Sequence, residues 1–305
     1  MLSPLLFSVL APLAGSLVLA AGTPNVLIYT ATTGFRHDSI PTAVQALQAQ
    51  AERANVNFTH TEDGTRFNDE ELATYDGVVF LSTTGDVLNK RQLAAFQSWL
   101  NKGGNFVGIH AATACLMETD FYVREIGAVF DYHPEFQMAT IDVIGPSHPS
   151  TDHLPKAWNV HDEIYNFQSD PRKLGAVVIL SADMSSYVDF PQDPIQGTPH
   201  PTAWIQERGA GVEEGGTAGR SFYTSLGHAN ETWQSDDFIN HILGGISWVL
   251  DSTTTRAFNA SGLVGAMYVE PTPDSDSEKE ASPTGEGMGQ AVATEDGPEG
   301  YVLLL

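Results

Sequence analysis

The segment 103–112, Gly-Gly-Asn-Phe-Val-Gly-Ile-His-Ala-Ala, constrains the fold of this chain more than any other. Its apolar run, flanked by glycines, predicts a buried parallel strand that ends at His110. The small residues after it suit a tight strand-to-helix turn, which lifts one side chain out of an α/β sheet. Such elbows often carry a Cys or Ser nucleophile. Here the elbow carries an imidazole, which serves as a general base, a proton donor or a metal ligand.

Apolar runs alternate with helical patterns through the first half of the chain, and the second half is richer in β-structure. We expect strands at 25–30, 56–60, 77–81 and 104–110, with helices at 43–54 and 90–101, then strands at 136–144, 158–167, 175–181, 202–206 and 221–226 and a closing helix at 236–250. This order predicts an α/β fold with a parallel sheet flanked by helices. Ligands on such sheets bind at the carboxyl ends of the strands.

The two ends of the chain differ from its middle. Residues 1–22 have the short apolar run and small-residue cleavage pattern of a secretory signal peptide, although a basic start is missing. Residues 23–252 then form the folded domain. The segment 253–305 is expected to be a disordered acidic tail. Export would also agree with three glycosylation sequons, which begin at Asn57, Asn230 and Asn259.

The composition excludes several classes of partner. A formal net charge of −24 repels phosphate backbones and anionic membranes, so neither nucleic acid nor a lipid surface is expected. No second apolar segment is long enough for a membrane span. The lone Cys115 excludes an intrachain disulfide, and its place beyond the elbow argues against a nucleophile.

Histidines on loops after predicted strands are the strongest candidates for chemistry. The candidate catalytic residues are His37, His110, His228 and Glu163; His133, Tyr165 and Trp204 are candidate substrate contacts. Glu163 and Tyr165 alternate along one expected strand and so would face one side. Histidine and carboxylate ligands suit zinc or another divalent ion, but no His-Glu-x-x-His helix or cysteine pair specifies one.

Each of these residues also has a purely structural interpretation. His37 could bond the start of a helix, and His110 could be a buried imidazole bonded to the backbone. His133 precedes a proline, as ordinary turn residues do. Small neighbours leave room for a ligand beside His110 and His228, which favours a site there.

The ordered series of motifs resembles the ThuA-like, or trehalose-utilisation, family. The motifs are Gly34-Phe35-Arg36-His37, Tyr75 to Phe80, Gly103 to His110, Gly127 to Phe130, His133-Pro134, His148-Pro149, Asp162 to Tyr165, Pro201 to Trp204, Gly219 to Tyr223 and Leu226-Gly227-His228. The resemblance implies a flavodoxin-like fold related to class I glutamine amidotransferases. His110 would stand where those relatives place the cysteine nucleophile, so amidotransferase activity would be lost.

The resemblance also implies a link to disaccharide use, including pathways through 3-keto sugars. One hypothesis is a secreted enzyme that acts on a carbohydrate or 3-keto glycoside by proton abstraction, isomerisation or hydrolysis, with a divalent ion polarising the carbonyl. Tyr165 and Trp204 would then offer aromatic faces to a sugar ring. The alternative is a noncatalytic glycan-binding or scaffold protein that keeps the fold.

Overall fold

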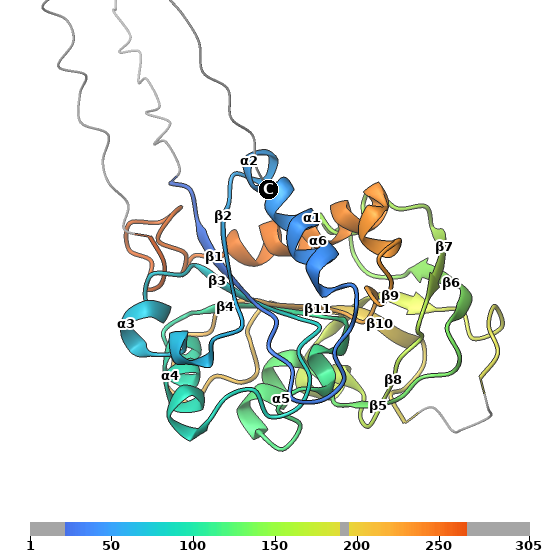
Figure 1. Cartoon of the computed structure of the whole chain (residues 1–305), viewed down its shortest axis with the longest axis horizontal. Helices are drawn as coiled ribbons and strands as arrows, with labels where there is room; N and C mark the ends of the chain where they lie inside the picture. The colour runs from blue at the N-terminus through green and yellow to red at the C-terminus, as the bar shows by residue number, and fades with distance from the viewer. Residues whose placement is uncertain (1–21, 190–194, 267–305) are drawn as a thin grey trace, which may run out of the picture. The chain divides into compact units, whose positions relative to one another are not determined.

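A computed structural model describes residues 22–189 and 195–266 of the 305-residue chain. The expected signal peptide lies outside these residues except for Gly22, and it stays a prediction. The elements are β1 (Asn25–Tyr29), α1 (Ile40–Ala49), α2 (Ala51–Ala54), β2 (Asn57–Thr61), α3 (Asp69–Leu72), β3 (Gly77–Leu81), α4 (Lys90–Asn101), β4 (Asn105–Ile109), α5 (Asp120–Ile126), β5 (Phe130–Tyr132), β6 (Gln137–Val143), β7 (Ala157–Asp162), β8 (Asn166–Phe167), β9 (Val177–Ala182), β10 (His200–Gln206), β11 (Ser221–Thr224) and α6 (Asp236–Leu250) (Figure 1).

The strands build one large sheet in the order β2-β1-β3-β4-β11-β10-β9-β6-β7. The five strands from β2 to β11 pair in parallel, and the rest of the sheet is antiparallel. The strands in the parallel half are mostly buried on both faces, as continuous apolar runs such as Gly77–Leu81 predict. The expected α/β fold, with a sheet flanked by helices and a β-rich second half, is confirmed.

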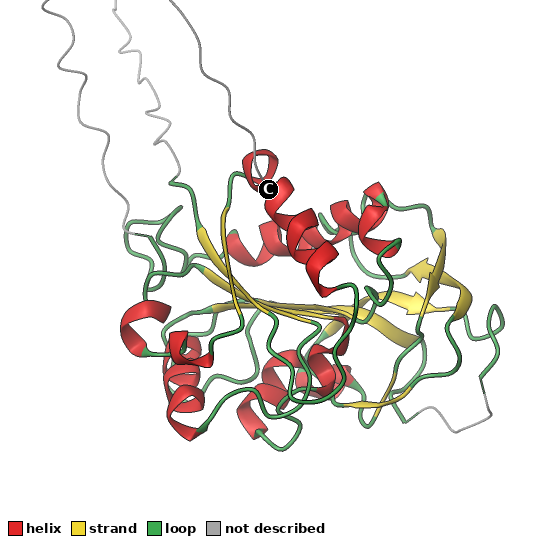
Figure 2. Ribbon diagram, viewed as in Figure 1, coloured by secondary structure: helices red, strands yellow, loops and turns green. Residues whose placement is uncertain are grey.

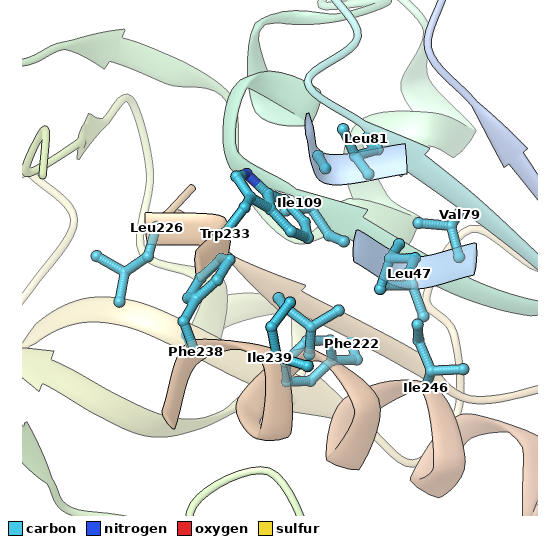
Figure 3. Packing of buried hydrophobic residues seen from close by; sticks show 14 of the residues in the cluster. Leu47, Val79, Leu81, Ile109, Phe222, Leu226, Trp233, Phe238, Ile239 and Ile246 are labelled. Atoms are coloured by element: carbon cyan, nitrogen blue, oxygen red, sulfur yellow. The ribbon is translucent and has the colours of Figure 1, made fainter. Parts of the chain in front are cut away.

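Helices cover both faces of the sheet. The helices α1 and α6 lie on one side, and α3, α4 and α5 lie on the other (Figure 2). On the first side, Phe238 and Ile246 of α6 pack against sheet residues that include Ile109 and Phe222 (Figure 3). On the second side, Phe96 and Trp99 of α4 join the second apolar cluster. These two buried layers fix the sheet and hold the strand ends in place.

Two expected elements are interrupted. The helix expected through 43–54 breaks at Gln50, which separates α1 from α2. The strand expected at 158–167 ends at Asp162 and resumes only at Asn166. Strand alternation therefore does not bring Glu163 and Tyr165 to one side, because both lie in the connection between β7 and β8.

The expectation that disorder begins at residue 253 is wrong for the segment up to 266. Thr255 and Val264 are buried and bridge to each other. The buried Asp76 carboxylate accepts backbone hydrogen bonds from Ala257 (3.3 Å) and Ala266 (3.2 Å). These contacts extend the folded domain past its expected end at 252. The remainder of the expected tail lies outside the described residues.

Candidate histidine–carboxylate site

The parallel strands β1, β4 and β11 deliver three histidines to one edge of the sheet. His110 follows β4 directly and has a φ of 55°, in the left-handed region. His37 lies in the loop between β1 and α1, and His228 follows β11. Because these strands are parallel, their carboxyl ends meet at one edge, where open α/β sheets bind their ligands.

Glu163 completes a group that we call the histidine–carboxylate cluster: His37, His110, Glu163 and His228. Each residue offers one potential ligand atom, and the four atoms all lie within 4.8 Å of one another. The Nε2 atoms of His37 and His110 are 3.0 Å apart. Glu163 Oε2 lies 3.6 Å from His110 Nε2 and 3.1 Å from His228 Nδ1. Residues distant in sequence thus converge on one point.

His110 is fully buried and neutral. Its Nδ1 lies 2.7 Å from the carbonyl oxygen of Ser225, and a carbonyl only accepts, so Nδ1 carries the proton. Burial is the main cause that holds the pKa of His110 well below its usual value, and the neighbouring His37 imidazole acts in the same direction. Its Nε2 therefore presents a lone pair to the cluster, which the Tyr165 hydroxyl approaches to 3.0 Å.

His37 is also held neutral. Burial, followed by the charge of His228, lowers the pKa of His37 to about 4. The Nδ1 of His37 is buried and has no hydrogen-bond partner among the described residues. At neutral pH, His37 and His110 thus bring two uncharged imidazoles to one point.

Glu163 and His228 form an ion pair at the other side of the cluster. Burial alone would raise the pKa of Glu163, but its hydrogen bond and attraction to His228 outweigh burial and lower this pKa. The same hydrogen bond to Glu163 raises the pKa of His228. The other carboxylate oxygen, Oε1, lies 3.4 Å from Nε2 of His133.

A buried carboxylate, Asp162, holds the loop that carries His228. It accepts backbone hydrogen bonds from Gly227 (2.9 Å) and His228 (3.2 Å), and also from Glu163 (2.9 Å). Gly227 has a φ of 131°, which a residue with a Cβ rarely adopts. Asp162 thus couples the positions of Glu163 and His228.

Six of the seven residues singled out in the sequence meet here. His133 stacks on Tyr165, with ring centroids 5.8 Å apart, at the exposed edge of the cluster. Trp204 does not meet them: it is buried, its indole donates to the carbonyl of Ile126, and its ring packs on Tyr223. With no open face, Trp204 is not a sugar contact, and the expectation for this residue is corrected.

Several contributors went unnoticed in the sequence. The sequence does not reveal that Asp162 holds the His228 loop, although Asp162 is adjacent to Glu163. A carboxylate that accepts backbone hydrogen bonds from a distant loop has no characteristic sequence motif. Phe35 (68% exposed) and Phe136 (36% exposed) line the opening over His37 and His228. A large aromatic residue in a polar loop, two positions before the candidate His37, is the sequence signal that could have found Phe35.

The cluster fits a divalent metal ion. Zinc–nitrogen bonds of about 2.0–2.1 Å place tetrahedral ligand atoms about 3.3 Å apart. Three pairs of ligand atoms in the cluster are 3.0, 3.1 and 3.6 Å apart, and all pairs lie within 4.8 Å. His110 donates a hydrogen bond from Nδ1 to a backbone carbonyl. Metal-binding histidines are usually oriented by such a bond from the ring nitrogen that does not bind the metal. Imidazole nitrogen and carboxylate oxygen are also ligand types that zinc takes in catalytic sites.

The fold and site define an α/β protein with a mostly parallel central sheet, flanked by helices, and a histidine directly after a buried parallel strand. The family profile described as "ThuA: Trehalose utilisation" matches residues 25–249, and the chain belongs to this family. The family supports a role related to carbohydrates.

Two solved structures share this fold. A putative ThuA-like protein from Bacteroides uniformis is 20% identical, with a TM-score of 0.62 over 79% of this chain and 96% of that one. A putative ThuA-like protein from Parabacteroides merdae is 17% identical, with a TM-score of 0.55 over 75% of this chain and 90% of that one. No curated protein matches the chain.

Proposed function

We propose that this protein is a secreted enzyme that acts on a carbohydrate, of the 3-keto glycoside class, at the histidine–carboxylate cluster. The observation that carries the proposal is the convergence of three imidazoles and one carboxylate within 4.8 Å at the ligand-binding edge of the sheet. Family membership supports the carbohydrate class of the substrate. Proton abstraction beside a keto group is the reaction that this set of groups suits best.

The cluster would hold a divalent ion through His37, His110, His228 and Glu163. When bound, such an ion polarises a carbonyl oxygen or lowers the pKa of a bound water. Two of the imidazoles are already neutral, so binding displaces no proton from them. The third, His228, is oriented by the loop that Asp162 holds.

Other side chains would contact the substrate and move protons. Burial holds the pKa of Tyr165 well above its usual value, so its phenol stays protonated and donates a hydrogen bond to an oxygen that gains charge. His133 lies at the exposed edge, 3.4 Å from Glu163 Oε1. Glu163 would take the proton of the substrate on Oε1, and His133 would pass it on to solvent, while Glu163 Oε2 faces the other histidines.

An opening of about 250 Å³, which we call the mouth pocket, leads to the cluster. Its lining includes Phe35, His37, Phe136, His228 and Ala229. A substrate that enters here would meet His37 and His228 first. The exposed rings of Phe35 and Phe136 would pack on the apolar face of a sugar.

Secretion is part of the proposal and rests on the N-terminal sequence pattern and the sequons. Asn57 is exposed on the edge strand β2, which makes it the most accessible of the three sequons. Treatment of the exported protein with an N-glycosidase should lower its mass. In an Asn57→Gln variant, this decrease in mass should be smaller by the glycan of that site. An equal decrease in the variant and the wild type would argue against glycosylation of Asn57.

Metal analysis with activity assays tests the catalytic part. We expect about one divalent ion per chain, removed by chelator together with turnover of a 3-keto glucoside, and both should return when the metal is restored. His110→Ala should lose both. Binding of sugar without any product would favour the noncatalytic alternative, and a metal-free protein with full turnover would refute the metal site.

A further inference from the structure

A second cavity, which we call the side pocket, lies next to the mouth pocket. Its volume is about 510 Å³, within the range of about 300–1,000 Å³ typical of small-molecule sites. Its apolar lining includes the half-buried Val160 and the buried side chains of Trp158, Leu226 and Phe238. These residues come from β7, from the segment after β11 and from α6, so the pocket is built on regular elements and their ends.

The two pockets share part of their walls. Phe136, Ala229 and Glu231 line both of them. The Phe136 ring lies 4.1 Å from the ring of His161 in the side pocket and 5.1 Å from the ring of His228 in the mouth pocket. A ligand held at His37 and His228 that extends past Phe136 would therefore enter the side pocket.

The lining limits the chemistry of an occupant. Trp158 and Phe136 suit a ring with an apolar face. Thr232 and Ser235 add polar groups that could contact hydroxyls at its edge. Asp162 and Glu231 are the charged side chains among the described lining residues, so an anionic group such as a phosphate would be repelled.

We propose that the side pocket binds the second ring of a glycoside whose first sugar lies at the histidine–carboxylate cluster. The second ring is a neutral ring with an apolar face, supplied either by another sugar or by an aromatic aglycone. This inference rests on the proposed function, because the cluster must take the first sugar. It makes the protein selective for glycosides over free monosaccharides.

Binding of matched probes tests the proposal. Calorimetry on the whole protein should give 4-nitrophenyl β-D-glucoside an affinity about tenfold or more above methyl β-D-glucoside, because its ring buries apolar surface. A comparison of the affinities for cellobiose and glucose shows whether the second ring can be a sugar. If only the nitrophenyl glucoside binds more tightly, the second ring is an aromatic aglycone. The nitrophenyl group should also quench the fluorescence of Trp158, and this quenching should be reduced in Trp158→Phe.

Pocket-filling variants supply the control. Val160→Phe and Thr232→Phe should abolish the difference between the two glucosides, and the half-buried Thr232 keeps the test open if Val160→Phe does not fold. Ala157→Phe adds the same ring to β7 outside the pocket and should leave the difference intact. Equal affinities in the wild type, an absence of binding for all these sugars, or a difference that survives both filling variants would overturn the inference.

The failure of the two proposals can be told apart. If the protein binds no metal but still prefers the nitrophenyl glucoside through Trp158, the metal site falls and the side pocket stands. If the protein binds metal and turns over substrate but shows no preference for the nitrophenyl glucoside, the side pocket falls and the proposed function stands.

Discussion

The Nδ1 atom of His110 lies 2.7 Å from the backbone oxygen of Ser225, and this contact determines which nitrogen of His110 faces the cluster. The two residues come from adjacent parallel strand ends, β4 and β11. The sheet itself therefore sets the tautomer of the imidazole, because the position of a backbone carbonyl follows from strand pairing. A side chain at the elbow without this geometry would not direct a lone pair to the same point.

Replacement of His110 by Gln should reduce turnover by about 10²–10⁴-fold, because glutamine offers no imidazole lone pair at this position. The melting temperature should change little in comparison. His153→Gln is a suitable control, since His153 is exposed and its Nε2 contacts the carbonyl of Asp237. Wild-type turnover in His110→Gln would contradict the assignment of the site.

Replacement of Asp162 by Asn should weaken metal binding by about 10–100-fold, the usual effect of losing an outer contact. The carboxylate accepts hydrogen bonds from Gly227, His228 and Glu163, and an amide group cannot accept with its nitrogen. Titration with zinc would measure the change. Thr232→Val is the control, because it removes only the hydroxyl that donates to Asp162; equal losses in both variants would argue against an anchoring role.

Replacement of Gly227 by Ala should both destabilise the protein and impair the site. Its φ of 131° strains any residue with a Cβ, at a cost of about 1–2 kcal/mol. Gly175 has a φ of 85° with open space around it, so Gly175→Ala imposes strain away from the cluster. Urea unfolding should show a loss in both variants, whereas metal binding should fall only in Gly227→Ala. Unchanged metal binding in Gly227→Ala would refute the link between the conformation of this loop and the histidine–carboxylate cluster.

Glu125 should make the stability depend on pH. Burial raises the pKa of Glu125 to about 8, despite a hydrogen bond from the backbone N–H of Gly211. The folded state then holds a proton that the unfolded state loses near pH 4.5, so the free energy of unfolding falls as the pH rises from about 4.5 to 8.

The Glu125→Gln variant should lack this contribution. Between pH 5.5 and 8, the wild type should lose stability relative to Glu125→Gln by on the order of 2 kcal/mol, measured by urea unfolding at each pH. Parallel profiles for the two proteins would show that Glu125 does not titrate in this range.

The sequence by itself determined the sheet and its helices. Short apolar runs such as 77–81 predict buried strands, and the apolar face of α4 predicts a helix that covers a sheet, so local pattern sufficed for the α/β fold. It also determined that His110 ends a strand. The interruption after Asp162 escaped prediction because it depends on hydrogen bonds to Gly227 and His228, which are distant in sequence.

Only the tertiary structure decided which candidates meet. His37 and Trp204 both lie near strands in the sequence, yet one reaches the cluster and the other is sealed against Tyr223. Strand order places β4 beside β11, and this adjacency, which no local pattern encodes, brings His110 to Ser225 and His228. The physical reason is that burial and pKa depend on neighbours in space, which the packing of the whole sheet selects.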